Sequence, residues 1–126
     1  MRLVAFFAIV SVATFVANPS QAQDVAAGEK VFTKCKVCHI ADEDKNKIGP
    51  SLHGVIGRTA GTHPGFSYSE AMVAAGTSGV KWDEATLATY LHDPKAMVKG
   101  TKMVFPGLKK DDEVANVIAY LKQFSP

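Results

Sequence analysis

The chain is poor in net charge and in cysteine, and it shows neither an internal repeat nor a long alternating pattern. Its 126 residues carry 14 Lys and Arg against 12 Asp and Glu, a net charge of +2. Nucleic-acid-binding proteins usually have a clearly basic face or a high isoelectric point, so this balance argues against a nucleic-acid partner. No apolar alternation is long enough to indicate a sheet. The length suits one domain.

The one sustained apolar run lies at the N-terminus. A short basic start precedes the apolar residues 3–17, and residues 18–22 end in small side chains. This layout is typical of a secretory signal cleaved after Ala22, and the run is shorter than the roughly 20 residues of a membrane span. We therefore expect residues 1–22 to be a removed signal peptide. Residues 23–126 are then a single periplasmic domain without stable membrane insertion.

Only two cysteines occur, and both lie in the sequence KCKVCH at residues 34–39. Two thiols followed by a histidine are compatible with a disulfide, a redox dithiol, half of a zinc site or a haem attachment point. A disulfide would close a very small loop, which adds little stability, and it leaves His39 unexplained. A redox dithiol is expected beside a βαβ pattern, which is missing here. Structural zinc needs four ligands, whereas the other histidines are scattered singly.

Haem attachment uses every residue of this motif. Two thiols on one helical turn can add to the two vinyl groups of a porphyrin, and the adjacent imidazole is then brought beneath the iron. Export also fits, because a covalent linkage retains a cofactor that dilution could remove. The motif therefore predicts one haem c attached through Cys35 and Cys38, with His39 bound to its iron.

The second axial ligand of such an iron decides its chemistry. An open sixth position favours peroxidase-like turnover or gas sensing, whereas a filled position favours electron transfer. Met72 lies among alanines, as a core residue would. Met97 follows a helix-start signal at 93–94 and is expected to pack from a short helix. Met103 lies in a loop bounded by glycines and broken by proline, which favours Met103 over the other methionines and over His53, His63 and His92.

The remaining periodicity predicts an all-α fold. Apolar residues recur at helical spacing over residues 25–35, and again over residues 114–121 after an acidic start that suits a helix N-terminus. A third helix is expected over residues 83–91. Gly28 would let the first and last helices cross closely. Since a helical shell of this size is thin, the haem is expected to supply much of the core.

In this order, the residues resemble the class I cytochromes c, a family that includes mitochondrial cytochrome c and bacterial cytochrome c2. The resemblance covers nearly all of residues 23–126. Beside the haem motif, it rests on Gly28, Phe32, residues 49–54, 57–58 and 65–68, Trp82, residues 90–91, Pro94, residues 100–103, Phe105 and residues 119–121. It implies a fold of about three main helices with crossing termini, and an iron held by His39 and Met103.

The resemblance also implies roles for residues around the haem. The carbonyl of Pro50 would accept a hydrogen bond from His39 and fix its orientation. Tyr90 would lie near the axial methionine, and Phe105 would cover the haem edge. Donors to the haem carboxylates would be Arg58, Tyr68, Trp82 and Thr101. The chain departs from the family at Met72, where an asparagine is frequent, and over residues 74–80, which are longer than in mitochondrial proteins and are expected to form a surface loop.

The implied function is a soluble one-electron carrier that is not an enzyme and acts as a monomer. Its partners would present acidic faces, as a cytochrome bc-type complex, a terminal oxidase, a reaction centre or a periplasmic dehydrogenase could. Lysines on both sides of the haem edge would steer such a partner. These are Lys34, Lys36, Lys95, Lys99, Lys102, Lys109 and Lys110. A small haem enzyme and a gas sensor remain the rival functions.

Overall fold

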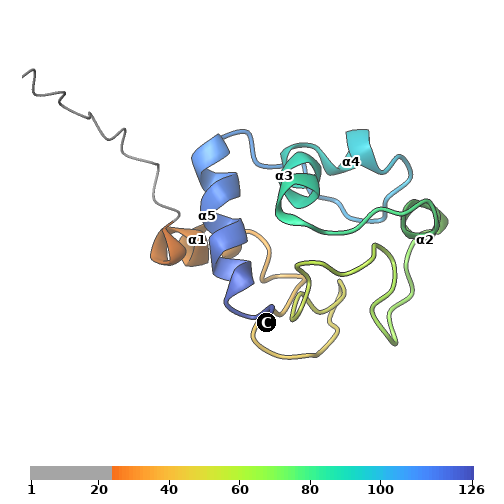
Figure 1. The fold of residues 1–126 in the computed structure, drawn as a ribbon, viewed down its shortest axis with the longest axis horizontal. Helices are drawn as coiled ribbons and strands as arrows, with labels where there is room; N and C mark the ends of the chain where they lie inside the picture. The colour runs from red at the N-terminus through yellow and green to blue at the C-terminus, as the bar shows by residue number, and fades with distance from the viewer. Residues whose placement is uncertain (1–23) are drawn as a thin grey trace, which may run out of the picture.

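The computed structural model describes residues 24–126, so the expected signal peptide lies outside the described residues. Within this part the chain is helical and has no β-strand, which confirms the all-α prediction. Its helices are α1 (Val25–Phe32), α2 (Glu70–Thr77), α3 (Glu84–His92), α4 (Pro94–Met97) and α5 (Asp111–Lys122). Figure 1 shows α1 against α5 at one end of the molecule and α2 at the other, with α3 and α4 between them.

Helix starts follow directly from capping residues in the sequence. The side-chain oxygens of Asp24, Ser69, Asp83 and Asp93 each accept a hydrogen bond from a backbone N–H in the first turn of α1, α2, α3 and α4. Such caps satisfy donors that have no partner within the helix. The last helix, α5, lacks a side-chain cap but has three acidic residues in its first turn, which favour the positive end of the helix dipole.

The first and last helices cross at Gly28, as the sequence predicts. A Cβ at Gly28 would overlap the backbone carbonyl of Asn116 in α5 and would lie 2.9 Å from the Cβ of Tyr120. The side chain of Asn116 also accepts a hydrogen bond from the backbone N–H of Asp24 at 2.9 Å. Phe32 packs on Tyr120 with ring centroids 5.2 Å apart. The contact between α1 and α5 is thus stabilised by packing and by hydrogen bonding.

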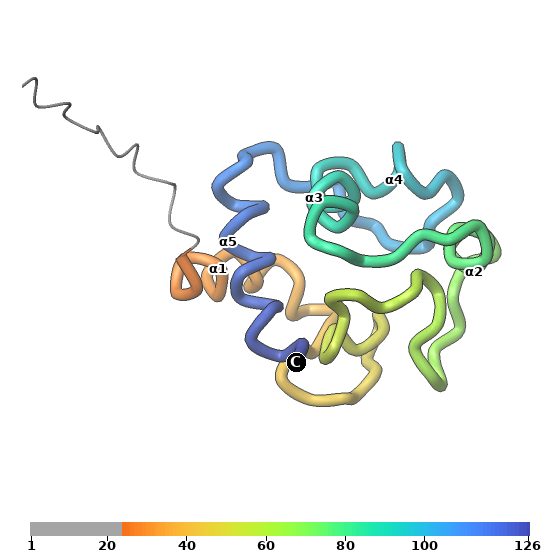
Figure 2. Tube along the Cα trace, in the orientation of Figure 1, coloured from red at the N-terminus to blue at the C-terminus, as the bar shows by residue number. Residues whose placement is uncertain are grey.

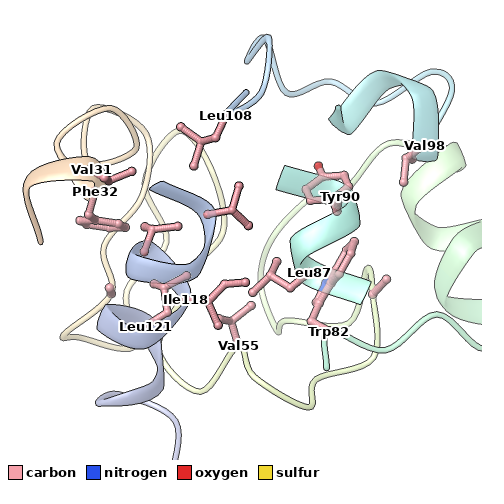
Figure 3. Close-up of a cluster of buried hydrophobic side chains, with 14 of the residues drawn as sticks. Val31, Phe32, Val55, Trp82, Leu87, Tyr90, Val98, Leu108, Ile118 and Leu121 are labelled. Atoms are coloured by element: carbon pink, nitrogen blue, oxygen red, sulfur yellow. The ribbon is translucent and has the colours of Figure 1, made fainter. Parts of the chain in front are cut away.

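The buried side chains form one cluster that runs from the α1/α5 crossing to α3. Figure 3 shows Leu87 between Ile118 of α5 and the ring of Trp82. On the α3 side, the rings of Trp82 and Tyr90 lie 4.7 Å apart, and both residues are buried. Because α3 contacts α5 and α4 while α5 contacts α1, this cluster connects the haem motif with the segment that carries Met103.

Residues 33–69 contain no α-helix and loop beneath the helices (Figure 2). Backbone hydrogen bonds between distant residues hold this segment in place. Gly49 N–H donates to the carbonyl of Cys38 at 2.8 Å, and Gly57 N–H donates to the carbonyl of Trp82 at 2.8 Å. Thr59 and Lys81 form an isolated antiparallel bridge. These contacts bring the loops against α3 without a sheet.

The expected surface loop over residues 74–80 is wrong in its first half. Residues up to Thr77 belong to α2, and only residues 78–80 lie outside it. The helix forms because Ser69 caps it, Glu70 lies in its first turn, and its alanines have high helix propensity. Met72 in this helix is buried, which confirms its reading as a core residue. The expected short helix with Met97 is also confirmed, as α4.

Among residues 24–126, no helix combines the length and the apolar character needed to cross a membrane.

A Gly28→Ala substitution tests the helix crossing. Helix propensity alone would make alanine about 1 kcal/mol more favourable than glycine. The overlap with Asn116 should reverse that sign and lower the free energy of unfolding by about 2 kcal/mol, as overpacked cores do. Guanidinium unfolding of the haem-loaded protein measures the difference. The exposed Ala26→Gly substitution in the same helix calibrates propensity alone, and a stabilised Gly28→Ala protein would contradict the close crossing.

Candidate functional site

The haem motif lies on helical turns that continue beyond α1. Cys38 N–H and His39 N–H both donate to the carbonyl of Cys35 at 3.0 Å, and Lys36 N–H donates to the carbonyl of Phe32 at 3.0 Å. These bonds place the two thiols and the imidazole within one short turn. Both cysteines are free thiols and half-buried. The α1/α5 crossing fixes the helix from which the motif extends.

The Cys35 thiol is not activated for redox exchange. Burial raises its pKa to about 11, nearby Lys34 opposes this shift, and Cys38 adds to it. Redox-active cysteines need a lowered pKa, because the thiolate is the nucleophile. A protonated, half-buried thiol is unsuited to thiol–disulfide exchange near neutral pH, which argues against the redox-dithiol reading of the motif.

The His39 ring is held by the backbone of the neighbouring loop. Its Nδ1 lies 2.8 Å from the carbonyl oxygen of Pro50, so Nδ1 carries the hydrogen and Nε2 carries the lone pair. A Cβ at Gly49 would overlap this ring, approaching Nδ1 to 2.7 Å. Burial lowers the pKa of His39, and the hydrogen bond to Pro50 opposes this shift. The imidazole is thereby kept neutral with Nε2 free, the form that binds a metal.

Met103 lies in the loop that follows α4. The hydroxyl of Tyr90 lies 4.0 Å from the Met103 sulfur, and the Met103 N–H donates to Thr101 Oγ1 at 3.3 Å. Burial raises the pKa of Tyr90, and a hydrogen bond with Thr101 opposes the shift. The Tyr90 hydroxyl therefore stays protonated and can donate a hydrogen bond to the Met103 sulfur. The sequence-predicted residues Tyr90, Thr101 and Met103 are thus brought together, and Phe105 packs half-buried beside the core.

The other candidate axial ligands have different surroundings. His63 pairs with Asp44, with Nε2 2.5 Å from the carboxylate, and His92 pairs with Asp111 at 3.1 Å. Met72 is buried in α2, and Met97 packs against the core from α4. Within residues 24–126 no three His, Cys, Asp or Glu side chains are grouped as metal ligands.

Three of the predicted haem-carboxylate donors lie in neighbouring segments. Arg58 donates to the carbonyls of Ser51, at 2.8 Å, and His53, and it also bonds with the Tyr68 hydroxyl. Trp82 is joined to Arg58 by a backbone hydrogen bond of 2.8 Å. The fourth, Thr101, lies in the Met103 loop. Burial lowers the pKa of Arg58, and Tyr68 and Asp44 oppose this shift.

Sequence reasoning missed His53 and His63 as parts of this region. The Nδ1 atoms of both rings are buried, with no hydrogen-bond partner among the described residues. It also missed Ser51, which is fully buried and hydrogen-bonded to the carbonyl of Glu43 at 2.8 Å. Both histidines are visible in the sequence, but nothing in their local pattern indicates burial. Only the folded arrangement places them beside Arg58 and Tyr68.

The residues present fit a porphyrin with two carboxylates. A half-buried guanidinium that forms no ion pair with a carboxylate of the described chain suits an anionic group. The cradle formed by Gly49 and Pro50 suits an imidazole bound to iron, because the hydrogen bond at Nδ1 leaves Nε2 available. A thiol pair, a held imidazole, a thioether and a guanidinium without a carboxylate partner are the groups that a small helical protein with a covalently attached haem requires.

Comparison with known proteins gives the family. The sequence model of cytochrome c matches residues 25–125. The chain is 49% identical over 108 residues to cytochrome c2 of Blastochloris viridis, covering 85% of this chain and 83% of that protein. It is 52% identical over 102 residues to cytochrome c-550 of Nitrobacter winogradskyi, covering 80% and 91%. The structure of cytochrome c2 from Rhodospirillum centenum matches with a TM-score of 0.78 and 46% identity, covering 82% of this chain and 99% of that one.

The chain belongs to the cytochrome c family. This confirms the resemblance to class I cytochromes c and the small cytochrome c fold. Members of the family carry a covalent haem c with its iron and transfer electrons, and the chain has one pair of thiols for that attachment.

A Gly49→Ala substitution tests the cradle of His39. The added methyl group should displace the ring and lengthen its hydrogen bond to Pro50. We expect the free energy of unfolding of the haem-loaded ferric protein to fall by about 2 kcal/mol, and its sulfur-to-iron absorption band to weaken. A Pro50→Ala protein keeps the accepting carbonyl and should keep the band. Equal loss of the band in both variants would contradict this role of Gly49.

Proposed function

We propose that the protein is a soluble periplasmic one-electron carrier whose haem iron is bound by His39 and Met103 in both oxidation states. The observation that carries this proposal is that each of the two side chains has its own partner in the chain. His39 is bonded to the Pro50 carbonyl, and the Met103 sulfur lies beside the Tyr90 hydroxyl. Side chains held in this way need little reorganisation when the iron changes its charge.

In this proposal each residue around the haem has a separate task. Cys35 and Cys38 attach the porphyrin, and Phe105 covers its edge. Pro50 orients His39, and Tyr90 does the same for Met103. The haem carboxylates accept hydrogen bonds from Arg58, Tyr68, Trp82 and Thr101, because burying a carboxylate without hydrogen-bond donors is costly. When bound, the haem supplies the one-electron couple of its iron.

The rival enzymatic function needs an exchangeable sixth ligand and an acid–base group beside it. The Tyr90 hydroxyl lies 4.0 Å from the Met103 sulfur, and burial raises the pKa of Tyr90, so the hydroxyl stays protonated near neutral pH and is unsuited to accept a proton. A gas sensor also needs an exchangeable sixth ligand. We therefore propose a carrier that does not itself transform a substrate.

Carbon monoxide uptake tests this function. The reduced protein should not bind carbon monoxide, because Met103 fills the position that the gas needs. A Met103→Ala protein should bind it readily, whereas Met72→Ala, which truncates a buried methionine in α2, should stay as resistant as the unaltered protein. Absorption spectra under carbon monoxide give the result. Ready uptake by the unaltered protein would contradict the carrier and favour the enzyme or the sensor.

The lysines expected to steer a redox partner differ in whether they form salt bridges within the chain. Lys34 is bound to Glu113 at 3.0 Å, so part of its charge is neutralised. Lys36, Lys95, Lys99 and Lys102 are exposed and form no salt bridge within residues 24–126. We propose that these four lysines attract the acidic face of a redox partner. Such steering is possible at a small net charge, because it depends on where the charges lie.

Stopped-flow rates with an acidic redox partner test this surface. The association rate should fall as salt rises, because exposed charges are screened. A protein with both Lys36→Ala and Lys99→Ala should associate roughly two- to tenfold more slowly at low salt. The exposed Lys81→Ala substitution, at the start of the chain segment before α3, is the matched control and should have little effect. Rates that do not respond to salt would count against the steering surface.

A further inference from the structure

The loop that carries Met103 has few hydrogen bonds of its own. The Met103 N–H donates to Thr101 Oγ1 at 3.3 Å, and the Thr101 N–H donates to the carbonyl of Val98 at 3.1 Å. Residues 104–107 form no hydrogen bond with the rest of residues 24–126. The position of the thioether therefore depends on how the two ends of this loop are attached to the helices.

One end of the loop is fixed by α4, and the other end returns to α3 (Figure 1). At the first end, Val98 is buried, and its N–H donates to the carbonyl of Pro94 at 2.9 Å. At the second end, Leu108 is almost fully buried, and its N–H donates to the carbonyl of Leu91 at 2.7 Å. The loop is thus closed on the helix that carries Tyr90, one residue before Leu91.

The residues on either side of Leu108 complete this closure at the last residue of α3. Gly107 has a φ of +99°, and a Cβ at this position would overlap the carbonyl oxygen of His92. Lys109 Nζ donates to the same carbonyl at 2.8 Å. The last carbonyls of a helix have no partner within the helix, and a cation beside them also interacts favourably with the negative end of the helix dipole. We call residues 107–109 the closing segment.

The ion pair between His92 and Asp111 lies next to the closing segment but is open to solvent. The two side chains are 40% and 93% exposed, and exposed ion pairs contribute little to stability. The attachment of the loop to α3 therefore depends mainly on the closing segment.

We propose that the closing segment is a positioning element for the sixth iron ligand, with Gly107 and Lys109 as its positioning residues. This inference rests on the proposed function, since it requires Met103 as an iron ligand. The closing segment is bonded to the last two residues of α3, and Tyr90 directly precedes them. It therefore fixes the loop relative to the hydroxyl that contacts the Met103 sulfur. Lys109, which the sequence groups with the steering lysines, has an intramolecular task instead.

Imidazole binding to the ferric haem-loaded protein measures how often the sixth position is open. Imidazole competes with Met103 for the iron, so its apparent dissociation constant falls as the open fraction rises. Lys109→Met removes the ammonium group and should lower this constant roughly three- to tenfold. Lys109→Arg keeps a cationic donor and should bind imidazole nearly as weakly as the unaltered protein. A lysine that only steers a partner would leave the constant unchanged, which would overturn the proposal.

The matched control breaks a lysine contact at the other end of the same helix. Lys122 Nζ lies 2.5 Å from the carboxylate of Glu84 in the first turn of α3. Lys122→Met should leave the imidazole constant unchanged, because α3 is not attached to the Met103 loop there. An equal fall of the constant in Lys122→Met and Lys109→Met would contradict a specific role of the closing segment.

A Gly107→Ala substitution tests the close approach to α3. The added methyl group should push the chain away from the His92 carbonyl, lower the imidazole constant roughly tenfold and weaken the sulfur-to-iron absorption band. Gly79→Ala is the matched control, because Gly79 has a similar φ of +101° but open space around its Cβ position. It should change neither quantity. If Gly107→Ala does not retain a folded haem site, the comparison of Lys109→Met with Lys122→Met decides the question.

Two further outcomes separate positioning from a merely structural role and from a failure of the carrier function. A lower free energy of unfolding in both variants of the closing segment, with an unchanged band and an unchanged imidazole constant, would overturn the proposal. Carbon monoxide uptake by the reduced unaltered protein is measured in parallel. Ready uptake would overturn the carrier and the positioning role together, whereas resistance combined with unchanged imidazole constants in both variants would overturn the positioning role alone.

Discussion

The close contact between Gly28 and the backbone of Asn116 is the constraint on which the rest of the structure depends. It determines how near α1 and α5 approach, and α1 leads directly into the turn with both thiols and the imidazole of His39. Because α5 also packs on α3, the same contact fixes the distance between the haem motif and the residues near Met103. A change of crossing distance would therefore affect the positions of both His39 and Met103.

Between these helices, single polar side chains form hydrogen bonds to the backbone, as neighbouring strands do in a β-sheet. Ser51 is fully buried, donates to the carbonyl of Glu43 at 2.8 Å and accepts from His53 N–H at 3.1 Å. Asn46 accepts from the backbone N–H of Ser51 at 2.9 Å. A buried backbone group without a partner is costly, so each of these side chains replaces hydrogen bonds that a regular ladder would supply. These hydrogen bonds help to hold the long segment of residues 33–69 in place.

The sequence allowed the helices to be predicted where the signals are local. Asp24, Asp83 and Asp93 precede apolar periodicity at the observed starts of α1, α3 and α4, and the glycine-bounded loop of Met103 was recognisable in the same way. The prediction failed over residues 74–77, because a stretch longer than in mitochondrial proteins was expected to form a surface loop, whereas Ser69 caps a helix that includes these residues.

The pairing of His63 with Asp44 was not predictable, because it joins residues 19 positions apart in irregular chain. Neither residue belongs to a periodic pattern or to the haem motif, and a histidine beside a loop proline is by itself an ordinary surface residue. The burial of His63 results from the fastening of two loops, which depends on Asn46 and Pro64 as well. Such non-local polar contacts follow from the fold and have no signature in the residues alone.

The two side chains proposed to bind the iron are held with different strength, and the difference follows from their positions in the chain. His39 is bonded at 2.8 Å to a carbonyl, lies against Gly49, and follows Cys35 by four residues and Cys38 by one. Met103 has a sulfur contact of 4.0 Å and a backbone bond of 3.3 Å in a loop without helix. Sulfur is a weak acceptor, so the hydroxyl of Tyr90 orients the thioether more than it anchors it. The integrity of the site therefore depends chiefly on how well the core behind Tyr90, with Trp82 packed on its ring, keeps the Met103 loop closed.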